Sequence, residues 1–255
     1  MLTIERLNNI KALLEKNGSI NTKELSILFK VSEETIRRDL KKLSSEINFK
    51  IVRGGAFLHE TPNTQIPIDY REKMYIQEKN KIAIGCLKEI KDNEIIGLDN
   101  SSTALHIARL LNKSNKKLTV VTNSQRIISA LIENMNIKII CLGGELRKNT
   151  RSYVGYQTTE ALERLFLDKS FVSCSSINLD YGITENNSLE AKVKEIMLIN
   201  SFKKFLVVDH TKFAAPSGNK ICTIKGIDKI ITDSNVSKDI IKQLGALKIK
   251  VEICS

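Results

Sequence analysis

Hydrophobic residues recur with two different periods along the chain. Over the first 58 residues they return every three or four positions, as at Leu7, Ile10, Leu13 and Leu14, which predicts short amphipathic helices. From about residue 70, short β-branched runs alternate with helical segments, and the runs occupy residues 94–98, 118–122, 137–142, 169–173, 205–208, 229–232 and 248–254. This alternation predicts an α/β domain with a largely parallel sheet.

The helical segment has the spacing of a helix-turn-helix. Asn21 and Ser32 stand where side chains cap helix N-termini, and three residues separate the two helices that they start. We expect the second helix and its turn to bury Leu25, Leu28 and Val31.

The third helix, which starts after Ser32, has one apolar and one basic face. Ile36, Leu40 and Leu43 form the expected buried stripe. The opposite face carries Thr35, Arg37, Arg38, Lys41 and Lys42. A helix-turn-helix places such a helix in the major groove of DNA, so these five residues are candidate DNA contacts. The alternative is a solvated basic face on a small helical bundle.

Residues 49–57 alternate like a strand and carry the pair Gly54-Gly55. They follow the third helix, as the wing of a winged helix does. Lys50 and Arg53 are expected to contact DNA phosphates there.

Residues 59–67 contain two of the three prolines and few apolar side chains, which favours an extended linker. We therefore expect a DNA-binding domain at residues 1–58, a linker at 59–68 and a second domain at 69–255.

Polar residues follow the predicted strands of the second domain. Ligands of open α/β sheets bind at the carboxyl ends of the strands, so these residues are candidate ligand contacts. After the first strand come Asp99, Ser101, Ser102 and Thr103, followed by a helix at 104–111. Hydroxyls and helix amides at this point suit a phosphate, but the same residues would equally serve as an ordinary N-cap.

Other strand ends add to the candidate site. They contribute Thr122, Asn123, Gly143, Gly144, Asp209 and Lys212, and the two glycines would allow a close backbone approach to a ligand. Glu190 and Lys194 stand one turn apart on a predicted helix, where a surface ion pair is the alternative to a role in the site.

Composition narrows the choice of partners. Forty Lys and Arg against 29 Asp and Glu give a net charge of +11, which favours polyanions. No apolar run has the length of a membrane span or a signal peptide, and a cytoplasmic protein is expected. Five cysteines without C-x-x-C spacing and three histidines suggest neither disulfides nor zinc. Buried, inert thiols and no cofactor are therefore expected.

The N-terminal motifs resemble those of the DeoR family of bacterial repressors of sugar and nucleoside metabolism. The resemblance lies in Ser32-Glu-Glu-Thr-Ile-Arg-Arg-Asp-Leu40 and Gly54-Gly55-Ala56. Asp39 within this motif is expected to be structural and to pair with a basic neighbour, since DNA phosphates would repel it. The family wing usually has histidine where this chain has Arg53.

The second domain resembles the family's effector domain, which implies a fold like ribose-5-phosphate isomerase. The matching motifs are Asp99-x-x-Ser-Thr103, Val120-Val-Thr-Asn-Ser124, Leu142-Gly-Gly-Glu-Leu146, Val154-Gly155 and Asp209-x-x-Lys-Phe213. The resemblance implies that the Asp99 loop holds a phosphate and that Asp209 and Lys212 border a sugar pocket. Ser101 replaces a family glycine, and Ser173-Cys-Ser-Ser176 replaces Gly-Ala-Asp-Gly, with loss of flexibility and of a carboxylate.

These observations predict a DNA-binding repressor of sugar metabolism genes that responds to a phosphorylated sugar. Symmetric operators call for a homo-oligomer, formed through the effector domain. One alternative is an isomerase or hydrolase with an attached DNA-binding module, with Glu190 or Asp209 as its base. Another is a regulator without small-molecule control, which the serine replacements would permit.

Overall fold

The computed structural model describes residues 2–17, 19–47, 49–52, 54–58 and 68–255. Contacts between residues divide the chain into an N-terminal unit, Met1–Met74, and a C-terminal unit, Tyr75–Ser255. The predicted contact Arg53 and all of the predicted linker at 59–68 except Ile68 lie outside the described residues, and Ile68 already begins a helix.

The N-terminal unit is a helix-turn-helix with a small antiparallel sheet. Its elements are α1 (Thr3–Asn17), β1 (Ser19–Asn21), α2 (Thr22–Phe29), α3 (Glu33–Leu43), β2 (Phe49–Val52), β3 (Gly55–Leu58) and α4 (Ile68–Lys73). The strands are ordered β1-β3-β2, and β2 pairs with β3 in the hairpin of a wing. The strand-like stretch predicted at residues 49–57 is therefore two strands joined by a turn, and Gly54 in this turn adopts a φ of 98°, which favours glycine.

Both predicted helix caps are present in this unit. The Asn21 side chain accepts hydrogen bonds from the amides of Lys23 and Glu24 at the start of α2, and Ser32 Oγ accepts one from Thr35 N at 3.1 Å. The stripe of Ile36, Leu40 and Leu43 is buried, as predicted.

The prediction for Leu28 was wrong, since its side chain is 61% exposed. Helical residues advance by about 100° each. Thr22, Leu25 and Phe29 share the inward face of α2, and Leu28 points about a quarter-turn away from it.

The C-terminal unit is built on a seven-stranded parallel sheet with the order β15-β14-β12-β9-β4-β5-β6. Its strands are β4 (Ile95–Leu98), β5 (Leu118–Thr122), β6 (Ile137–Cys141), β9 (Leu167–Val172), β12 (Ser201–Val207), β14 (Lys229–Asp233) and β15 (Lys250–Cys254). All seven correspond to predicted runs. Small antiparallel pairings, which the sequence pattern did not reveal, involve β7 (Glu145–Arg147), β8 (Ser152–Val154), β10 (Ser176–Asn178), β11 (Gly182–Glu185) and β13 (Asn219–Cys222).

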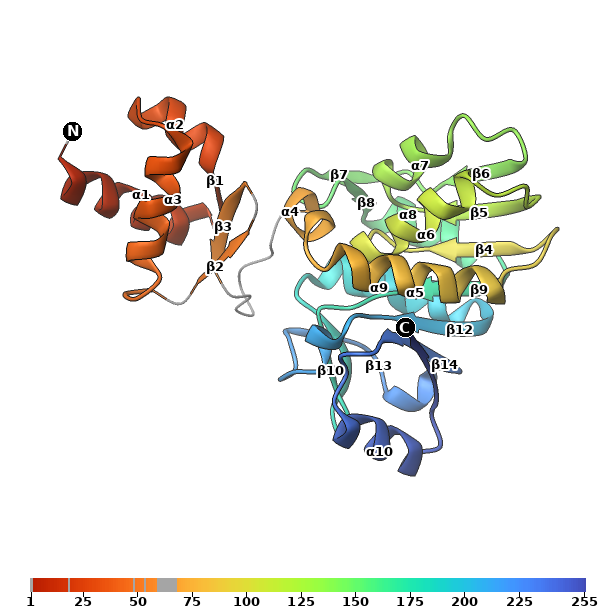
Figure 1. Ribbon diagram of the computed structural model, residues 1–255. Coiled ribbons are helices and arrows are strands. Elements are labelled where there is room, and N and C mark those ends of the chain that lie inside the picture. The colour runs from red at the N-terminus through yellow and green to blue at the C-terminus, as the bar shows by residue number, and fades with distance from the viewer. Residues whose placement is uncertain (1, 18, 48, 53, 59–67) are drawn as a thin grey trace. The chain divides into compact units, whose positions relative to one another are not determined.

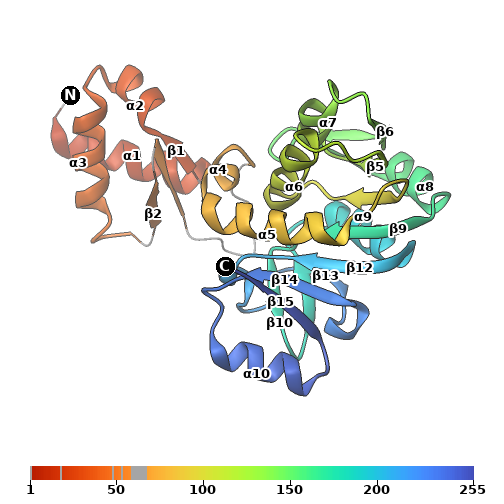
Figure 2. The same ribbon diagram turned by 45° about the vertical axis from the view of Figure 1, so that its right-hand side comes forward.

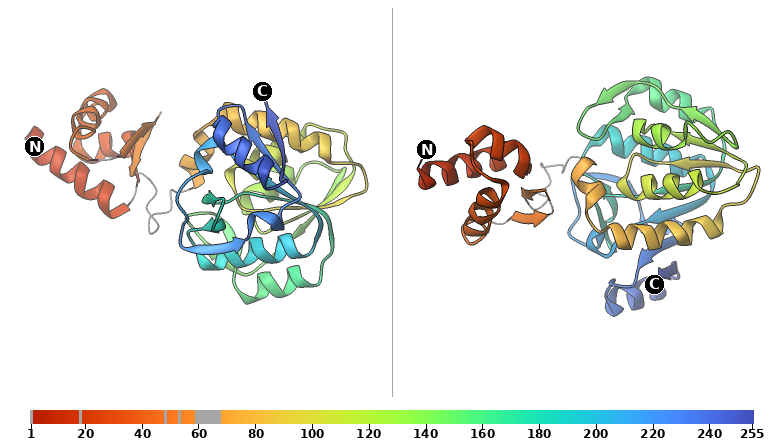
Figure 3. Two further views of the ribbon diagram at one scale, coloured as in Figure 1. Left: turned by 90° about the horizontal axis from the view of Figure 1, so that it is seen from below. Right: turned by 45° about the horizontal axis from the view of Figure 1, so that its top comes forward.

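Helices cover both faces of the sheet (Figure 1 and Figure 2). One face packs against α5 (Ile76–Glu89), α6 (Ser102–Asn112) and α7 (Gln125–Leu131). The other packs against α8 (Tyr156–Glu163), α9 (Ser188–Ile199) and α10 (Lys238–Ala246), and α10 lies beside the edge strand β15 (Figure 3). Phe205 and Val207 join the first core and Leu206 joins the second, as the alternation of side chains along a strand requires.

The sheet has a topological switch point between β4 and β9. From β4 the chain adds β5 and β6 on one side, and then returns to place β9 on the other side of β4. The helix α6, which follows β4, packs on one face of the sheet, and the next helix after β9, α9, packs on the other face. A crevice forms at the carboxyl ends of such a strand pair, and this is where open α/β sheets bind ligands.

The expectation of buried thiols was wrong for Cys141, which is exposed at the end of the edge strand β6. Cys86, Cys174 and Cys254 are buried, and burial raises the pKa of each thiol. Among the described residues, no helix combines the length and the apolar character that crossing a membrane requires.

Candidate functional site

The predicted DNA contacts lie on the exposed side of α3. Arg37 and Arg38 are 52% and 75% exposed, and they form long pairs of 3.6–3.8 Å with Glu33 and Glu34 of the same helix. Lys41 and Lys42 are exposed in its last turn. Thr35 is half-buried and its hydroxyl lies 2.9 Å from Ser32 Oγ. Exposed pairs of this kind contribute little free energy, so the arginines can exchange them for phosphate or base contacts at low cost.

A buried ion pair attaches α3 to α1. Arg6 Nε donates to Asp39 Oδ2 at 2.6 Å, and both side chains are nearly inaccessible. Asp39 therefore has the structural role predicted for it, with Arg6 as the basic neighbour. Lys50 lies in β2, in register with Phe57 of β3.

At the switch point, a carboxylate joins the ends of β4 and β9. Asp99 follows β4, and its Oδ2 accepts a hydrogen bond of 2.9 Å from the amide of Ser173, which follows β9. Its Oδ1 accepts hydrogen bonds from the amide and the hydroxyl of Ser101, at 3.1 and 2.5 Å. Asp99 is fully buried.

Ser101 is the N-cap of α6. Its Oγ accepts a hydrogen bond of 3.0 Å from Ala104 N, so α6 begins at Ser102, two residues before the predicted start. The backbone of Ser101 has a φ of −74°, which any residue adopts, so the replacement of the family glycine imposes no strain. Ser102 and Thr103 are buried in the first turn of α6.

Glu190 and Lys194 of α9 do not form the surface ion pair considered above. Both are buried, and Lys194 instead pairs with Glu185 of β11 and with Asp99, at 3.5 Å from Asp99 Oδ2. Burial disfavours the charged ammonium, but Glu185, Asp99 and Glu190 more than compensate, and the pKa of Lys194 is raised. The spacing of Glu190 and Lys194 places them on one face of a helix, but it does not indicate whether that face meets solvent or the end of a strand.

Glu190 accepts hydrogen bonds from two hydroxyls that the sequence analysis did not identify. Thr150 Oγ1 donates to Glu190 Oε1 at 2.6 Å, and Ser152 Oγ donates to the same atom at 3.2 Å. Arg147 Nε lies 3.3 Å from this oxygen. Asn100 Nδ2 donates to Ser152 Oγ at 3.2 Å, which links Glu190 to the loop after β4.

Glu185 also escaped the sequence analysis, since a single glutamate in a short strand carries no periodic signal. Its carboxylate accepts a hydrogen bond from Ser175 Oγ, at the position where the family pattern has aspartate. A carboxylate therefore lies at this loop, although it comes from β11. Ser176 Oγ donates to the carbonyl of Ala215 at 2.6 Å.

Asp209 and Lys212 lie after β12, beside β9. Asp209 accepts hydrogen bonds from the amide and hydroxyl of Thr211 in the short 3-10 helix His210–Lys212. Burial alone would raise the pKa of Asp209, but Lys212, Thr211 and Lys79 together lower it. The charges of Lys194 and Lys212 both lower the pKa of the buried thiol of Cys174, against the larger effect of its burial.

The remaining predicted residues lie on the other side of β4. Thr122 and Asn123 end β5 and are buried, and Asn123 Nδ2 donates to the Tyr153 carbonyl at 2.8 Å. Gly143 and Gly144 follow β6 and are exposed, two strands from β4. A side chain at Gly144 would meet Val154 O at 2.6 Å, so packing within the chain requires this glycine. Four strand spacings, about 19 Å, separate the ends of β6 and β12.

A winged helix-turn-helix joined to an α/β domain with a charged switch point defines a DNA-binding regulator with a sensor domain. Two family models match the corresponding parts of the chain, the DeoR-like helix-turn-helix domain at residues 6–61 and the DeoR C terminal sensor domain at residues 74–234. The chain belongs to the DeoR family of transcriptional regulators.

Two transcriptional regulators are similar to this chain over nearly its whole length. The HTH-type transcriptional regulator GolR of Listeria innocua is 33% identical, and the alignment covers 99% of both chains. The glycerol-3-phosphate regulon repressor of Escherichia coli is 30% identical over 100% of both chains. Among solved structures, ribose 5-phosphate isomerase A from Neisseria gonorrhoeae aligns with a TM-score of 0.41 and 18% identity over 57% of this chain, which spans about half the length of that enzyme.

Proposed function

We propose that the protein represses sugar metabolism genes and that a phosphorylated sugar, bound at the switch point, controls its affinity for DNA. The name of the Escherichia coli relative, a glycerol-3-phosphate regulon repressor, supports this assignment. The observation that carries it is the buried charge at the switch point, where Asp99 and Lys194 meet between β4 and β9. Buried charges are costly, and open α/β sheets bind ligands at this position.

We expect the bound ligand to replace hydrogen bonds that the protein now makes within itself by hydrogen bonds between the protein and the ligand. In this structure Asp99 and Glu190 accept from hydroxyls of the protein. Sugar hydroxyls would take these places, while the phosphate would lie against the first turn of α6 with Ser102 and Thr103, near the ammonium of Lys212. The lowered pKa of Asp209 keeps this carboxylate a charged acceptor at neutral pH.

A contact in the C-terminal unit offers a route from the ligand to the DNA-binding unit. Tyr75, the first residue of this unit, packs edge-on against His210, with 5.4 Å between the ring centroids. His210 lies between Asp209 and Lys212 and is also held by Asp233, at 3.0 Å. A ligand that moves the 3-10 helix would therefore also move Tyr75. The contacts of Tyr75 would then differ between the ligand-free and the ligand-bound protein, and such a difference is what coupling between the sugar site and the DNA-binding unit requires.

For DNA, we propose that α3 enters the major groove with Thr35, Arg37, Arg38, Lys41 and Lys42, and that two copies bind a symmetric operator.

Large apolar side chains available for self-association lie at the amino ends of β9 and β12, where Phe166 and Phe202 are 85% and 81% exposed. Such exposure is unusual for aromatic residues and supports an interface there. Light scattering is expected to show that the wild type forms a dimer or a larger assembly. The double variant Phe166→Ser/Phe202→Ser is expected to be dissociated in the same measurement.

We propose that the protein is not an enzyme. Glu190, a candidate base, already accepts two hydroxyl hydrogen bonds, and Asp209 is bonded to Thr211. Isomer conversion of a bound sugar phosphate, followed by NMR, would contradict this proposal.

Calorimetry of the full chain against a panel of sugar phosphates tests the ligand assignment. One member is expected to bind and to release operator DNA. Lys212→Ala is expected to weaken binding by about tenfold to a hundredfold, since one charge-assisted contact contributes about 1.5–3 kcal/mol. Ser102→Glu is expected to abolish binding while circular dichroism shows the fold retained. The matched control Lys242→Ala removes an exposed lysine from α10 and is expected to change nothing.

Unaltered affinity in both Lys212→Ala and Ser102→Glu would place the ligand elsewhere. If no sugar phosphate bound, the alternative of a regulator without small-molecule control would replace this proposal.

A further inference from the structure

The hairpin of β7 and β8, residues 145–154, forms a two-stranded sheet of its own beside the switch point. Thr150 and Ser152 of this hairpin are completely buried, although both side chains are polar. Their hydroxyls donate to Glu190 Oε1, at 2.6 and 3.2 Å. A segment from outside the central sheet therefore supplies hydrogen-bond donors to one carboxylate of the switch-point site.

The hairpin also contacts two asparagines that follow neighbouring strands of the central sheet. Asn100, after β4, donates from Nδ2 to Ser152 Oγ at 3.2 Å. Asn123, after β5, donates from Nδ2 to the carbonyl of Tyr153, and the Tyr153 amide donates to the carbonyl of Asn123, both at 2.8 Å. Asn123 Oδ1 is buried and has no hydrogen-bond partner among the described residues. The hairpin thus occupies polar groups at the strand ends where the proposed ligand would bind.

Little apolar contact holds the tip of the hairpin, residues 147–153, in place. Within residues 145–154, all of which the structure describes, Val154 is the one member of a hydrophobic core. Val154 lies at the base, where Gly144 packs against its carbonyl. Segments with few buried apolar contacts open locally at a lower cost in free energy than the core. The tip can therefore leave the switch point while the base stays packed.

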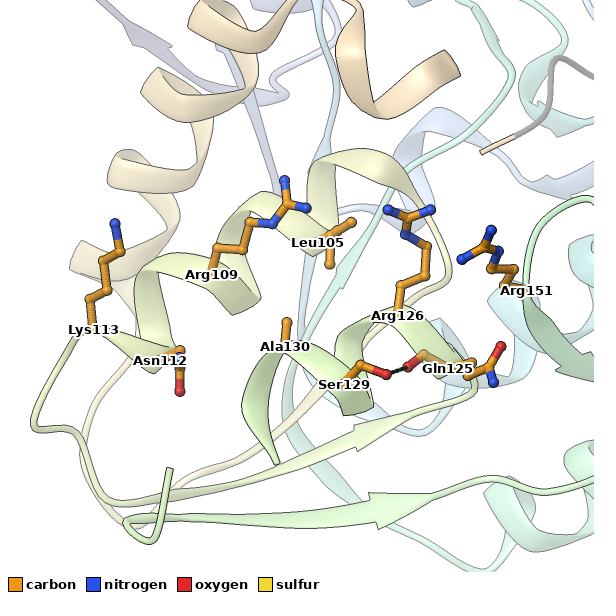
Figure 4. Close-up of a pocket in the computed structure, with 9 residues that line it drawn as sticks. All are labelled: Leu105, Arg109, Asn112, Lys113, Gln125, Arg126, Ser129, Ala130 and Arg151. Atoms are coloured by element: carbon orange, nitrogen blue, oxygen red, sulfur yellow. Dashed lines mark hydrogen bonds between the residues drawn. The ribbon is translucent and has the colours of Figure 1, made fainter. Parts of the chain in front are cut away.

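The backbone of the tip is strained at Arg151. Its φ of 47° lies in the left-handed region, which residues with a side chain rarely adopt. The side chains of Thr150 and Ser152 turn inward to Glu190, whereas the Arg151 side chain is exposed and lines a pocket with Gln125 of α7 (Figure 4). The contacts with Glu190 hold this conformation, so a displaced tip would lose the strain.

We propose that the hairpin is an autoinhibitory lid, whose tip takes the place of the sugar in the ligand-free protein and is displaced by the sugar on binding. This inference rests on the function proposed above and names the segment that the ligand moves. Thr150 Oγ1 and Ser152 Oγ lie 2.8 Å apart, close to the separation of two neighbouring hydroxyls of a sugar. A sugar phosphate with two such hydroxyls could donate to Glu190 as these side chains do.

Hydrogen–deuterium exchange of the full-length, ligand-free protein, followed by NMR, tests whether the tip opens by itself. We expect the amide of Tyr153 to exchange at least about a hundredfold faster than the amides of β5 and β9. Its rate is expected to stay constant in urea below the unfolding transition, because a local opening exposes little surface. Exchange of Tyr153 at the rate and with the urea dependence of the core strands would overturn the lid.

Variants distinguish a local opening from unfolding of the domain. Ile230→Val, in the core, is expected to speed exchange in β5 and β9 by about two- to tenfold and to leave the Tyr153 amide within about twofold. Thr150→Val/Ser152→Ala is expected to speed exchange at Tyr153 by about tenfold or more, since Glu190 loses two donors. An equal response of Tyr153 and the core strands to Ile230→Val, or no response of Tyr153 to the double variant, would overturn the lid.

A matched control removes two hydroxyls elsewhere. Ser129 Oγ and Thr159 Oγ1 donate to backbone carbonyls of their own helices, α7 and α8, at 2.9 and 3.0 Å. Ser129→Ala/Thr159→Val is expected to keep the Tyr153 exchange rate within about twofold of the wild type, because these hydrogen bonds do not involve Glu190. A response as large as that of the hairpin variant would indicate a general loss of stability and would overturn the lid.

Calorimetry separates the lid from the proposed function. The probes are glycerol 3-phosphate and ribose 5-phosphate, which each carry a phosphate and two neighbouring hydroxyls. One of them is expected to bind Thr150→Val/Ser152→Ala at least about tenfold more tightly than the wild type, because no lid has to be displaced. Equal affinities would overturn the lid and keep the sugar site. Binding of neither probe to the double variant would overturn the sugar as the group that displaces the lid, even if the tip opens.

Discussion

The charged residues of α3 and those of the switch point are alike in chemistry but opposite in setting. Arg37 and Arg38 are exposed and pair only loosely with glutamates of their own helix. Lys194 is buried, and its partners Glu185 and Asp99 come from a different strand and a different loop. The pairs of α3 are local and replaceable, whereas those of Lys194 hold three segments together.

This difference separates two kinds of binding surface. A surface for DNA gains from charges that leave their partners easily, because the phosphate backbone supplies new ones. A site for a small ligand gains from groups that are already oriented and shielded from water, where each interaction is stronger. The chain uses the first arrangement in its N-terminal unit and the second in its C-terminal unit, and three experiments test the contrast.

The largest effect is expected for Lys194→Ala, which leaves Glu185 and Asp99 buried without their cation. Breaking a buried pair by removing one partner costs about 3–5 kcal/mol of unfolding free energy. The matched control is Lys192→Ala on the same helix, whose lysine is exposed and pairs with Glu195 at 2.9 Å. That loss is expected to stay below about 1 kcal/mol. Urea unfolding measures both, and equal losses would contradict the distinction between the two settings.

The next effect concerns DNA. Arg37→Ala and Arg38→Ala are each expected to lose about 1–3 kcal/mol of operator binding where the arginine contacts a base edge, or to reduce the salt dependence where it contacts phosphate. Stability is expected to change by less than about 0.5 kcal/mol, because both side chains are exposed. Lys11→Ala on α1 is the control. Electrophoretic mobility shifts at several salt concentrations give the result, and wild-type binding by the double variant would disprove the assignment of α3.

The smallest effect is a pH dependence at Asp209, where burial and the neighbouring cation act in opposite directions. Because the folded state lowers the pKa of this carboxyl below its ordinary value of 3.8, the ionised group stabilises the fold at neutral pH. That contribution is lost as the pH falls through the lowered value. Asp209→Asn is therefore expected to be less stable than the wild type at about pH 7, with the gap narrowing toward about pH 3. A gap in unfolding free energy that stayed constant with pH would contradict the shift.

The sequence by itself determined the local features of both units. The caps at Asn21 and Ser32 and the buried stripe of α3 follow from bonds and spacings within a few residues, and the structure contains them. The seven parallel strands were likewise visible as short β-branched runs, because a strand buried on both faces needs continuous apolar residues. The same runs placed Asp99 and Asp209 at strand ends, and the family motifs added the ligand-binding roles that the resemblance implies for them.

Only the tertiary structure decided which strand ends meet and which charges are buried. It placed Ser173 against Asp99 across the switch point, and it buried Lys194 beside Glu185, nine residues away in the sequence but on a different element. It also brought Arg151 together with Arg109 and Arg126, and the three residues line one pocket beside α6 and α7. The order of strands in the sheet sets these contacts, and the spacing of side chains along the chain does not predict that order. Periodicity shows that a residue lies on one face of a helix, but what that face meets depends on segments that are distant in sequence.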